Sequence, residues 1–204
     1  MVKDPRETLR SLDRRATVAK LLADRRGLLV VTGLGSPTWD VAALGDDERN
    51  FYLWGAMGLA TMTGLGLALA RPNDDVAVIT GDGELLMGLG SLATTGVQAP
   101  KNLSVVVLDN ERYGETGMQA SHTAFGVDLA GVARASGFKV AREVRDEAGL
   151  AEIARLLRAK AGPVFANVKV KAEDVPRVLP PRDGALLKDR FRAAVLGAEK
   201  RMRR

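Results

Sequence analysis

Short apolar runs alternate along this chain with longer segments whose apolar residues recur at helical spacing. Buried strands are expected at residues 28–32, 51–54, 76–80, 103–108, 138–144 and 163–170. Helices are expected between and before them, at residues 4–26, 59–70, 84–98, 128–136 and 146–161. This alternation predicts an α/β fold with a doubly wound, mostly parallel sheet and helices on both faces.

The strands at residues 76–80 and 103–108, with the helix between them, form the centre of this pattern. A helical crossover joins parallel strands, so both strands end at the same edge of the sheet. The first strand leads into Asp82 and the second into Asn110. These two side chains are therefore expected side by side at the carboxyl edge, where open α/β sheets bind their ligands.

The chemistry of this edge suits a metal-bound diphosphate. Asp82 offers a carboxylate, Asn110 an amide oxygen, and the loop centred on Arg112 further backbone carbonyls, which together suit Mg²⁺. Gly81 and Gly83 let a ligand come close to the backbone without obstruction by side chains. The helix that follows would direct its free N–H groups toward an anion.

Two other glycine patterns do not form nucleotide-binding motifs. In the turn at residues 33–38, Thr38 takes the place of the third glycine of a dinucleotide fingerprint, and a similar pattern at residues 88–93 lies inside a helix. No Gly-Lys-Ser/Thr sequence occurs, which excludes a P-loop. A flavodoxin-like nucleotide binder that works without Mg²⁺ stays open only by analogy of fold.

Residues 51–70 carry no charge, and 20 such residues are long enough to span a membrane. Glycines at the turn of residues 55–58 instead divide the segment into a short strand and a helix. Gly64 and Gly66 would let that helix pack closely against a sheet. The composition therefore favours a core element and no membrane association.

The net charge of +5 arises in residues 188–204, which hold seven Lys/Arg and two Asp/Glu. The remainder is electrically balanced, which argues against a nucleic-acid-binding domain. One α/β domain is expected at residues 1–175, followed by a Pro-containing linker and a basic helical tail at 176–204. The chain has no Cys, so neither disulfides nor thiolate metal sites are expected. The N-terminal residues show a helix start at Asp4 and Pro5 and no apolar signal-peptide core, so a cytoplasmic location is expected.

Gly81-Asp82-Gly83, 26 intervening residues and then Asn110 resemble the thiamine diphosphate motif of the 2-oxo acid decarboxylase and acetolactate synthase superfamily. That family usually has two Asn at the end of the motif, and Asp109 takes the first place here. More narrowly, GDGELLMGLGSLAT and LDNERYGETGMQASHT resemble the cofactor-binding subunit of sulfopyruvate decarboxylase and the C-terminal half of phosphonopyruvate decarboxylase. The resemblance covers residues 27–170 and implies thiamine diphosphate and Mg²⁺ as cofactors.

The resemblance assigns roles to particular residues. Ser36 and Thr38 would lend hydroxyls to the diphosphate, although Ser36 could instead simply open a helix. The Gly55 carbonyl would meet the aminopyrimidine, and Met57 would bend the cofactor from beneath, although Met57 could instead fill the core. The expected cofactor-binding residues are Ser36, Thr38, Gly55, Met57, Gly81, Asp82, Gly83, Glu84, Asn110, Tyr113 and Gly114, and the expected metal ligands are Asp82, Asn110 and Arg112.

The polar segment at residues 111–126 is expected to be a functional loop. It contains His122, the only histidine, for which a structural role and an acid–base role both stay open. Related decarboxylases have a similar TG-x-Q stretch, so Thr116, Gln119 and His122, together with Met57, are the candidate catalytic residues. Glu115 stands where a Ser is expected, which leaves the substrate open.

Enzymes of the resembled family use two α/β domains, and a chain of 204 residues has room for only the diphosphate-binding one. The resemblance thus implies a separate pyrimidine-binding subunit that carries an activating glutamate, assembled as a heterotetramer. It implies decarboxylation of a small 2-oxo acid, with the cofactor accepting electrons as carbon dioxide leaves. A carboligating, acetolactate synthase-like subunit and a non-catalytic regulatory subunit remain alternatives.

Overall fold

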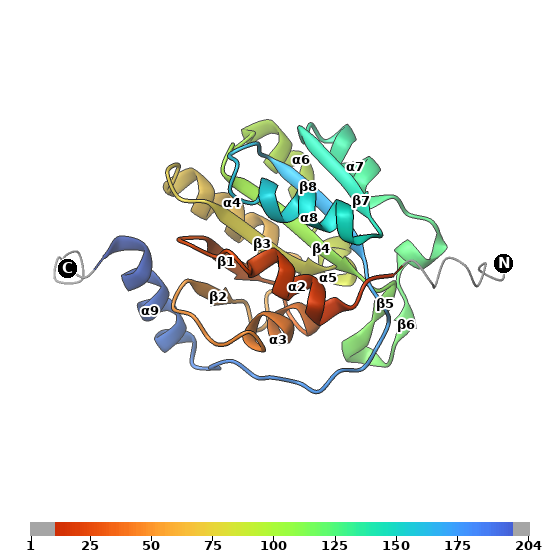
Figure 1. Cartoon of the computed structure of the whole chain (residues 1–204), viewed down its shortest axis with the longest axis horizontal. Helices are drawn as coiled ribbons and strands as arrows, with labels where there is room; N and C mark the ends of the chain where they lie inside the picture. The colour runs from red at the N-terminus through yellow and green to blue at the C-terminus, as the bar shows by residue number, and fades with distance from the viewer. Residues whose placement is uncertain (1–10, 198–204) are drawn as a thin grey trace.

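The computed structural model describes residues 11–197, which form a six-stranded sheet between two layers of helices (Figure 1). All neighbouring strands of this sheet run parallel, in the order β2-β1-β3-β4-β8-β7. The strands are β1 (Leu29–Thr32), β2 (Asn50–Tyr52), β3 (Val76–Gly81), β4 (Leu103–Asp109), β7 (Val140–Val144) and β8 (Val164–Lys169). The predicted doubly wound α/β class is confirmed.

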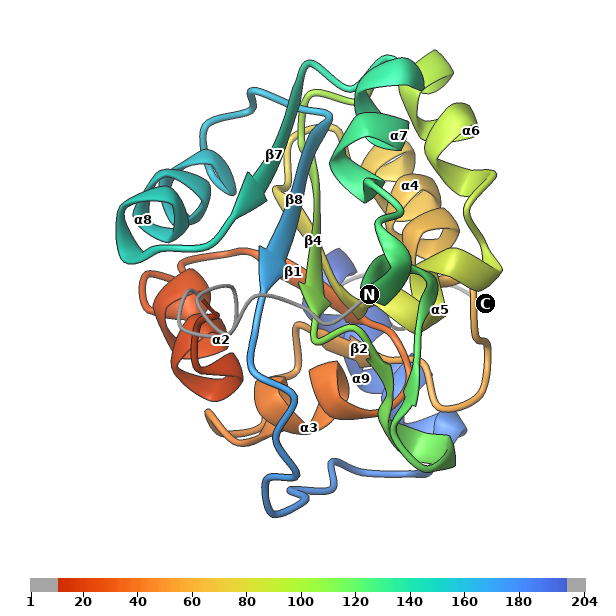
Figure 2. The same cartoon turned by 90° about the vertical axis from the view of Figure 1, so that its right-hand side faces the viewer.

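Helices cover both faces of the sheet (Figure 2). On one face lie α2 (Arg14–Leu22), α3 (Ser36–Ala42) and α8 (Glu147–Leu156). On the other face lie α4 (Ala60–Ala70), α6 (Ser91–Gln98) and α7 (Leu129–Ala135), with the short α5 (Asp82–Met87) beside them. Alternate residues of each strand serve the two layers: Val76 and Val78 of β3 join one core, and Ala77 and Ile79 the other.

The first described helix starts later than its sequence pattern predicts. Asp13 caps α2 by accepting a hydrogen bond from the Ala16 N–H at 2.7 Å. Leu12 is extended and pairs with Val170 beyond the end of β8. A continuous helix through residues 11–13 was therefore a wrong prediction, and the expected start at Asp4 lies outside the described residues.

The crossover between β3 and β4 is two helices, not the single helix predicted at residues 84–98. Gly88 ends α5, and a Cβ atom on Gly88 would lie only 1.9 Å from the carbonyl oxygen of Gly58. The helix ends here because the backbone at Gly88 touches the backbone at Gly58, a contact that a side chain on Gly88 would prevent. The first of the two helices begins at Asp82 itself, so the motif lies at its first turn.

The segment after β4 is more ordered than a plain loop. It forms a hairpin, β5 (Arg112–Tyr113) with β6 (Gln119–Ala120), and two short 3₁₀ turns, η1 (Gly114–Thr116) and η2 (His122–Phe125). Tyr113 pairs with Gln119 in this hairpin. The hairpin places the candidate loop residues beside the carboxyl ends of β3 and β4.

Residues 171–183 run without helix or strand beneath α3 and lead to α9 (Gly184–Leu196) beside β2 (Figure 1). Arg15 and Trp54 hold this segment by donating to the carbonyls of Pro176 (2.6 Å) and Pro181 (2.9 Å). Phe191 of α9 meets Phe51 with ring centroids 5.2 Å apart. The tail is helical as far as residue 196, and the boundary at residue 175 stays a prediction. None of the described helices has the length and apolar character needed to cross a membrane.

Candidate functional site

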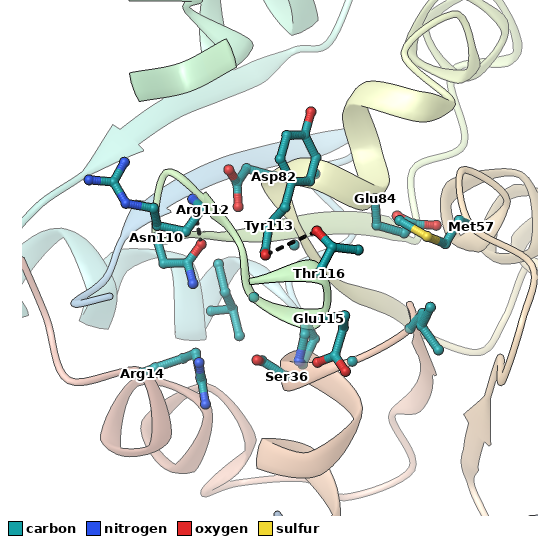
Figure 3. Close-up of a pocket in the computed structure, with 17 residues that line it drawn as sticks. Arg14, Ser36, Met57, Asp82, Glu84, Asn110, Arg112, Tyr113, Glu115 and Thr116 are labelled. Carbon is teal, nitrogen blue, oxygen red and sulfur yellow. Dashed lines mark hydrogen bonds between the residues drawn. The ribbon is translucent and has the colours of Figure 1, made fainter. Parts of the chain in front are cut away.

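A pocket opens where β3 and β4 end (Figure 3). Gly81 pairs with Leu108 in the register of these strands, so the residues that follow them emerge together. The pocket has about 620 Å³ of empty space, open solvent at its mouth included. Its lining residues are Arg14, Leu34, Gly35, Ser36, Pro37, Met57, Gly81, Asp82, Gly83, Glu84, Leu108, Asn110, Arg112, Tyr113, Gly114, Glu115 and Thr116.

Asp82 is a buried acid that has no cationic partner among the described residues. Its carboxylate is 2 % exposed and accepts hydrogen bonds from the hydroxyls of Ser121 and, at 3.3 Å, Thr123. Burial raises the pKa of Asp82 to about 6, and the nearby charge of Asp109 adds to the rise. A carboxylate that is costly to ionise without a cation suits a metal ligand.

The neighbouring Asp109 already has its partners. It is fully buried and accepts hydrogen bonds from Lys169 (2.6 Å), Asn167 (2.8 Å) and Thr123 (2.8 Å). Burial lowers the pKa of Lys169, but Asp109 and Glu111 outweigh that effect and leave the pKa above its ordinary value. This position, where the resembled family has Asn, is therefore occupied by an internal ion pair.

Asn110 lines the pocket at the start of a tight turn. Its Oδ1 accepts a hydrogen bond from the Arg112 N–H at 3.0 Å, and the Asp109 carboxylate accepts one from the Glu111 N–H at 3.0 Å. Glu111 takes the left-handed conformation at φ 60°, so the turn is tightly defined. The Arg112 guanidinium bonds the Glu111 carbonyl at 3.0 Å and points away from the pocket (Figure 3).

The donor set fits Mg²⁺ better than a softer metal. No cluster of three or more His, Cys, Asp or Glu occurs among residues 11–197. A metal here would take the Asp82 carboxylate, the Asn110 amide oxygen and backbone carbonyls, leaving positions for phosphate oxygens. Gly83 packs directly against Tyr113, because a Cβ atom on it would lie 2.6 Å from the Tyr113 ring.

Glu84 lines the pocket, where its expected role at the cofactor stays a prediction, and its carboxylate is bonded within the chain. Its buried carboxylate accepts hydrogen bonds from the N–H groups of Gly58 (2.9 Å) and Ala60 (3.1 Å) and from the Thr80 hydroxyl. Both carboxylate oxygens of Glu84 thus accept hydrogen bonds from the protein itself. Glu84 fastens the turn before α4 to the end of β3.

That turn presents Met57 to the pocket. The Met57 side chain is 37 % exposed and belongs to neither hydrophobic core, so the alternative of a core filler is wrong. Gly58 takes φ 85°, a conformation that favours glycine, and the Glu84 bonds hold it there. Gly55 lies on the same turn but does not line the pocket.

The two hydroxyl residues of the loop after β1 go to different places. Ser36 lines the pocket and is also the first residue of α3, so it both opens a helix and faces the site. The Thr38 hydroxyl is buried and bonds the Gly33 carbonyl (2.5 Å) and the Thr32 hydroxyl (2.6 Å). The structure thus brings Ser36, and not Thr38, to the pocket.

Of the candidate catalytic residues in and after the hairpin, only some line the pocket. Thr116 lines the pocket and donates to Gln119 Oε1 at 2.9 Å, while Gln119 and His122 lie outside the pocket lining. His122 Nδ1 lies 3.1 Å from the Tyr113 hydroxyl. Glu115 lines the pocket, with its carboxylate against Gly35.

Sequence reasoning missed three residues of the site. Ser121 and Thr123 hold Asp82, and Arg14 lines the pocket from α2. The two hydroxyl residues lie in the polar segment that was expected to be functional, so their composition was a usable signal. Arg14 gave no signal, because a charged residue on an amphipathic helix is ordinarily solvated.

Residues 36–168 match the family model described as "Thiamine pyrophosphate enzyme, C-terminal TPP binding domain". The chain belongs to this family. It is 38 % identical over 192 residues to "Sulfopyruvate decarboxylase subunit beta" of Methanothermobacter thermautotrophicus, covering 92 % of this chain and 97 % of that one. It is 37 % identical over 186 residues to "Phosphonopyruvate decarboxylase" of Streptomyces viridochromogenes, covering 88 % of this chain and 45 % of the longer relative.

A solved structure with the same fold is benzoylformate decarboxylase from Polynucleobacter necessarius, with a TM-score of 0.68 at 20 % identity. The match covers 86 % of this chain and 36 % of that one. At this identity the likeness shows the fold alone. The family's cofactor is thiamine diphosphate, and the donor set at Asp82 and Asn110 fits its usual Mg²⁺.

Proposed function

We propose that this chain is the cofactor-binding subunit of a two-chain, thiamine diphosphate-dependent decarboxylase of small 2-oxo acids such as sulfopyruvate or phosphonopyruvate. The observation that carries the proposal is Asp82, a buried carboxylate without a cation, placed beside Asn110 at the ends of adjacent strands. The proposal is supported by a relative of about the same length as this chain and by a much longer relative. A protein named as a beta subunit is covered over 97 % of its length, and a longer "Sulfopyruvate decarboxylase" from Methanosarcina acetivorans over only 39 %.

In this proposal Asp82 and Asn110 hold Mg²⁺, with the Arg112 backbone carbonyl as a further ligand. Gly81, Gly83 and Gly114 give the diphosphate access to the backbone, and Ser36 adds a hydroxyl. The bound cofactor supplies an electron sink for decarboxylation. Met57 bends it from the side of the turn that Glu84 fastens, and Thr116 of the hairpin meets the substrate. Gln119 and His122 would join Thr116 only if the hairpin moved when the complex forms.

The partner in this proposal is a separate pyrimidine-binding chain that carries the activating glutamate, in a heterotetramer. Met57 of the pocket lining is 37 % exposed, and Leu59 and Met62, which follow it in the chain, are 52 % and 38 % exposed. Neighbouring exposed apolar side chains are expected to be covered by another surface. A cytoplasmic location stays a prediction, which cell fractionation would check.

Co-purification of the tagged chain, followed by reconstitution, tests the proposal. The complex with its partner, supplied with thiamine diphosphate and Mg²⁺, is expected to release carbon dioxide from sulfopyruvate or phosphonopyruvate. Each chain alone is expected to be inactive, and a complex carrying Asp82→Asn serves as the control for cofactor dependence. Turnover by this chain with no second polypeptide present would refute the split-enzyme assignment.

The same assay separates decarboxylation from carboligation. Similarity to "Acetolactate synthase isozyme 2 large subunit" of Escherichia coli covers 29 % of this chain, against 92 % for the beta subunit named above. Aldehyde and carbon dioxide in equal amounts are therefore the expected products. A hydroxy-keto acid in place of the aldehyde would support the carboligating alternative, and binding of cofactor without turnover would support a regulatory subunit.

A further inference from the structure

The wall of the pocket opposite the two strand ends contains a buried cation, Arg14. This residue is 6 % exposed, yet it lines the pocket together with Ser36. Its Nε donates to Asp40, which is fully buried, and the Arg15 Nε also donates to Asp40 at 3.3 Å. Two guanidinium groups thus share one carboxylate, and the cluster retains an excess positive charge beside the pocket.

The Arg14 guanidinium is not fully bonded within the part of the chain that the structure describes. Its Nη1 reaches the Glu173 carbonyl only at 3.5 Å, and no described residue accepts a hydrogen bond from Nη2. A guanidinium carries five N–H donors, and those of Arg14 that neither Asp40 nor the Glu173 carbonyl engages stay open to a ligand in the pocket. The free donors therefore favour a ligand with several acceptor oxygens.

Charges of both signs line the pocket, and the Glu115 carboxylate, which lies against Gly35, is a further negative charge. Asp82 lies at the strand ends, Arg14 lies on the α2 side, and Figure 3 shows both around one cavity. Arg112 is the other cation of the lining, but its guanidinium is turned outward to the Glu111 carbonyl. A diphosphate carries more negative charge than one Mg²⁺ neutralises, and Asp82 adds a further negative charge. A cation on the far wall supplies the balance.

We propose that Arg14 binds the phosphate oxygens of the cofactor, with Asp40, itself held by Arg15, fixing its guanidinium beside the pocket. This inference rests on the proposed cofactor site at Asp82 and Asn110. Asp40 fixes the Nε edge, which leaves the opposite edge of the guanidinium for the ligand. A sulfonate or phosphonate group of the substrate offers similar acceptor oxygens. The experiment therefore has to distinguish binding of the cofactor diphosphate from binding of the substrate's anionic group.

Calorimetry on the assembled complex measures the affinity for Mg²⁺–thiamine diphosphate and for thiamine, which lacks the phosphates. Arg14→Gln is expected to weaken binding of the diphosphate form by about 10- to 100-fold and to leave thiamine binding unchanged. Arg14→Lys retains the charge and is expected to lose less. Equal affinity of Arg14→Gln and wild type for the diphosphate form overturns the proposal.

Glu115→Gln provides a matched control, because it also neutralises one charge of the pocket lining, but of the opposite sign. It is expected to bind the diphosphate form at least as tightly as wild type. A loss equal to that of Arg14→Gln would mean that any change of the lining disturbs the site, which counts against the proposal. If Arg14→Gln fails to fold, Arg14→Gln/Asp40→Asn removes both members of the buried pair and must show the same selective loss.

The substrate arm uses saturating cofactor. The ratio of KM for sulfopyruvate to KM for pyruvate is expected to be the same in Arg14→Lys and wild type. A changed ratio with unchanged cofactor affinity assigns Arg14 to the substrate and overturns the cofactor assignment. A wild-type complex that binds cofactor in an Arg14-dependent way but decarboxylates nothing would refute the proposed function and leave the Arg14 site standing.

Discussion

The neighbouring strands β3 and β4 lead into two buried carboxylates that are neutralised in different ways. Asp109 at the end of β4 has an internal cation, Lys169, and three further donors. Among the described side chains, Asp82 just after β3 accepts from the Ser121 hydroxyl and, at 3.3 Å, from the Thr123 hydroxyl that it shares with Asp109, and its pKa is raised to about 6. Burial alone therefore does not mark a functional acid. The informative difference is whether the protein itself supplies the opposing charge.

The largest expected effect comes from removing the internal cation of Asp109. Lys169→Met leaves a fully buried carboxylate without its ion pair, which is expected to lower the free energy of unfolding by about 3–5 kcal/mol. Urea or thermal unfolding measures this loss. Lys169→Met/Asp109→Asn should recover most of it, because the amide needs no cation and keeps an acceptor oxygen. A single variant as stable as wild type would contradict the structural role of the pair.

Asp82→Asn changes the carboxylate that follows β3. In contrast to Lys169→Met, it should impair cofactor binding and leave the fold stable. Replacing the carboxylate by an amide removes the only formal charge among the expected ligands, so Mg²⁺-dependent cofactor binding should weaken by at least about 100-fold. Calorimetry on the assembled complex measures the affinity, and circular dichroism checks the fold. Retained affinity in the variant would remove Asp82 from the metal site.

These two carboxylates also show how far the sequence could be interpreted. The placement of Asp82 beside Asn110 follows from one β-α-β unit, because parallel strands must end at the same edge. The ion pair of Asp109 with Lys169 depends on β8 lying next to β4, and strand order is a tertiary property. The strand that carries Lys169 was expected at residues 163–170, but nothing local indicates which strand it would adjoin.

Arg14 and Thr38 also show what local sequence patterns cannot predict about the site. Thr38 was expected at the diphosphate from its position in a loop, but its hydroxyl turns inward to Gly33 and Thr32. Arg14 was not expected there at all, because α2 reaches the pocket only by packing against α3. The break in the crossover helix likewise depends on contact between Gly88 and Gly58, which are 30 positions apart in the sequence. Local patterns predict elements and nearby motifs, and packing decides the rest.

Met57→Ala tests whether the turn fastened by Glu84 serves chemistry or only binding. An interaction made mainly on the way to the transition state lowers kcat more than it weakens binding, so kcat should fall about 10-fold while the cofactor Kd changes little. Met62→Ala is the control, since Met62 is exposed to a similar degree, 38 % against 37 %, but does not line the pocket. Equal loss of kcat in both variants would argue against the bending role of Met57.

The last expected effect is a pH-dependent difference in stability between wild type and Asp82→Asn, measured without Mg²⁺. The folded-state pKa of Asp82, about 6, lies above the ordinary value of 3.8, so the folded chain holds this proton more tightly than the unfolded chain. Wild type should therefore lose stability relative to the variant as pH rises from about 4 to 6, and the difference should level off above that. Melting temperatures should differ by about 5 to 10 degrees at pH 7 and hardly at pH 4. Added Mg²⁺ should narrow the difference at pH 7, because the carboxylate then gains the cation that Asp109 already has in Lys169. A difference that is constant with pH would mean that Asp82 is ionised as easily in the folded chain as in the unfolded one, and the contrast between the two carboxylates would lose its electrostatic basis.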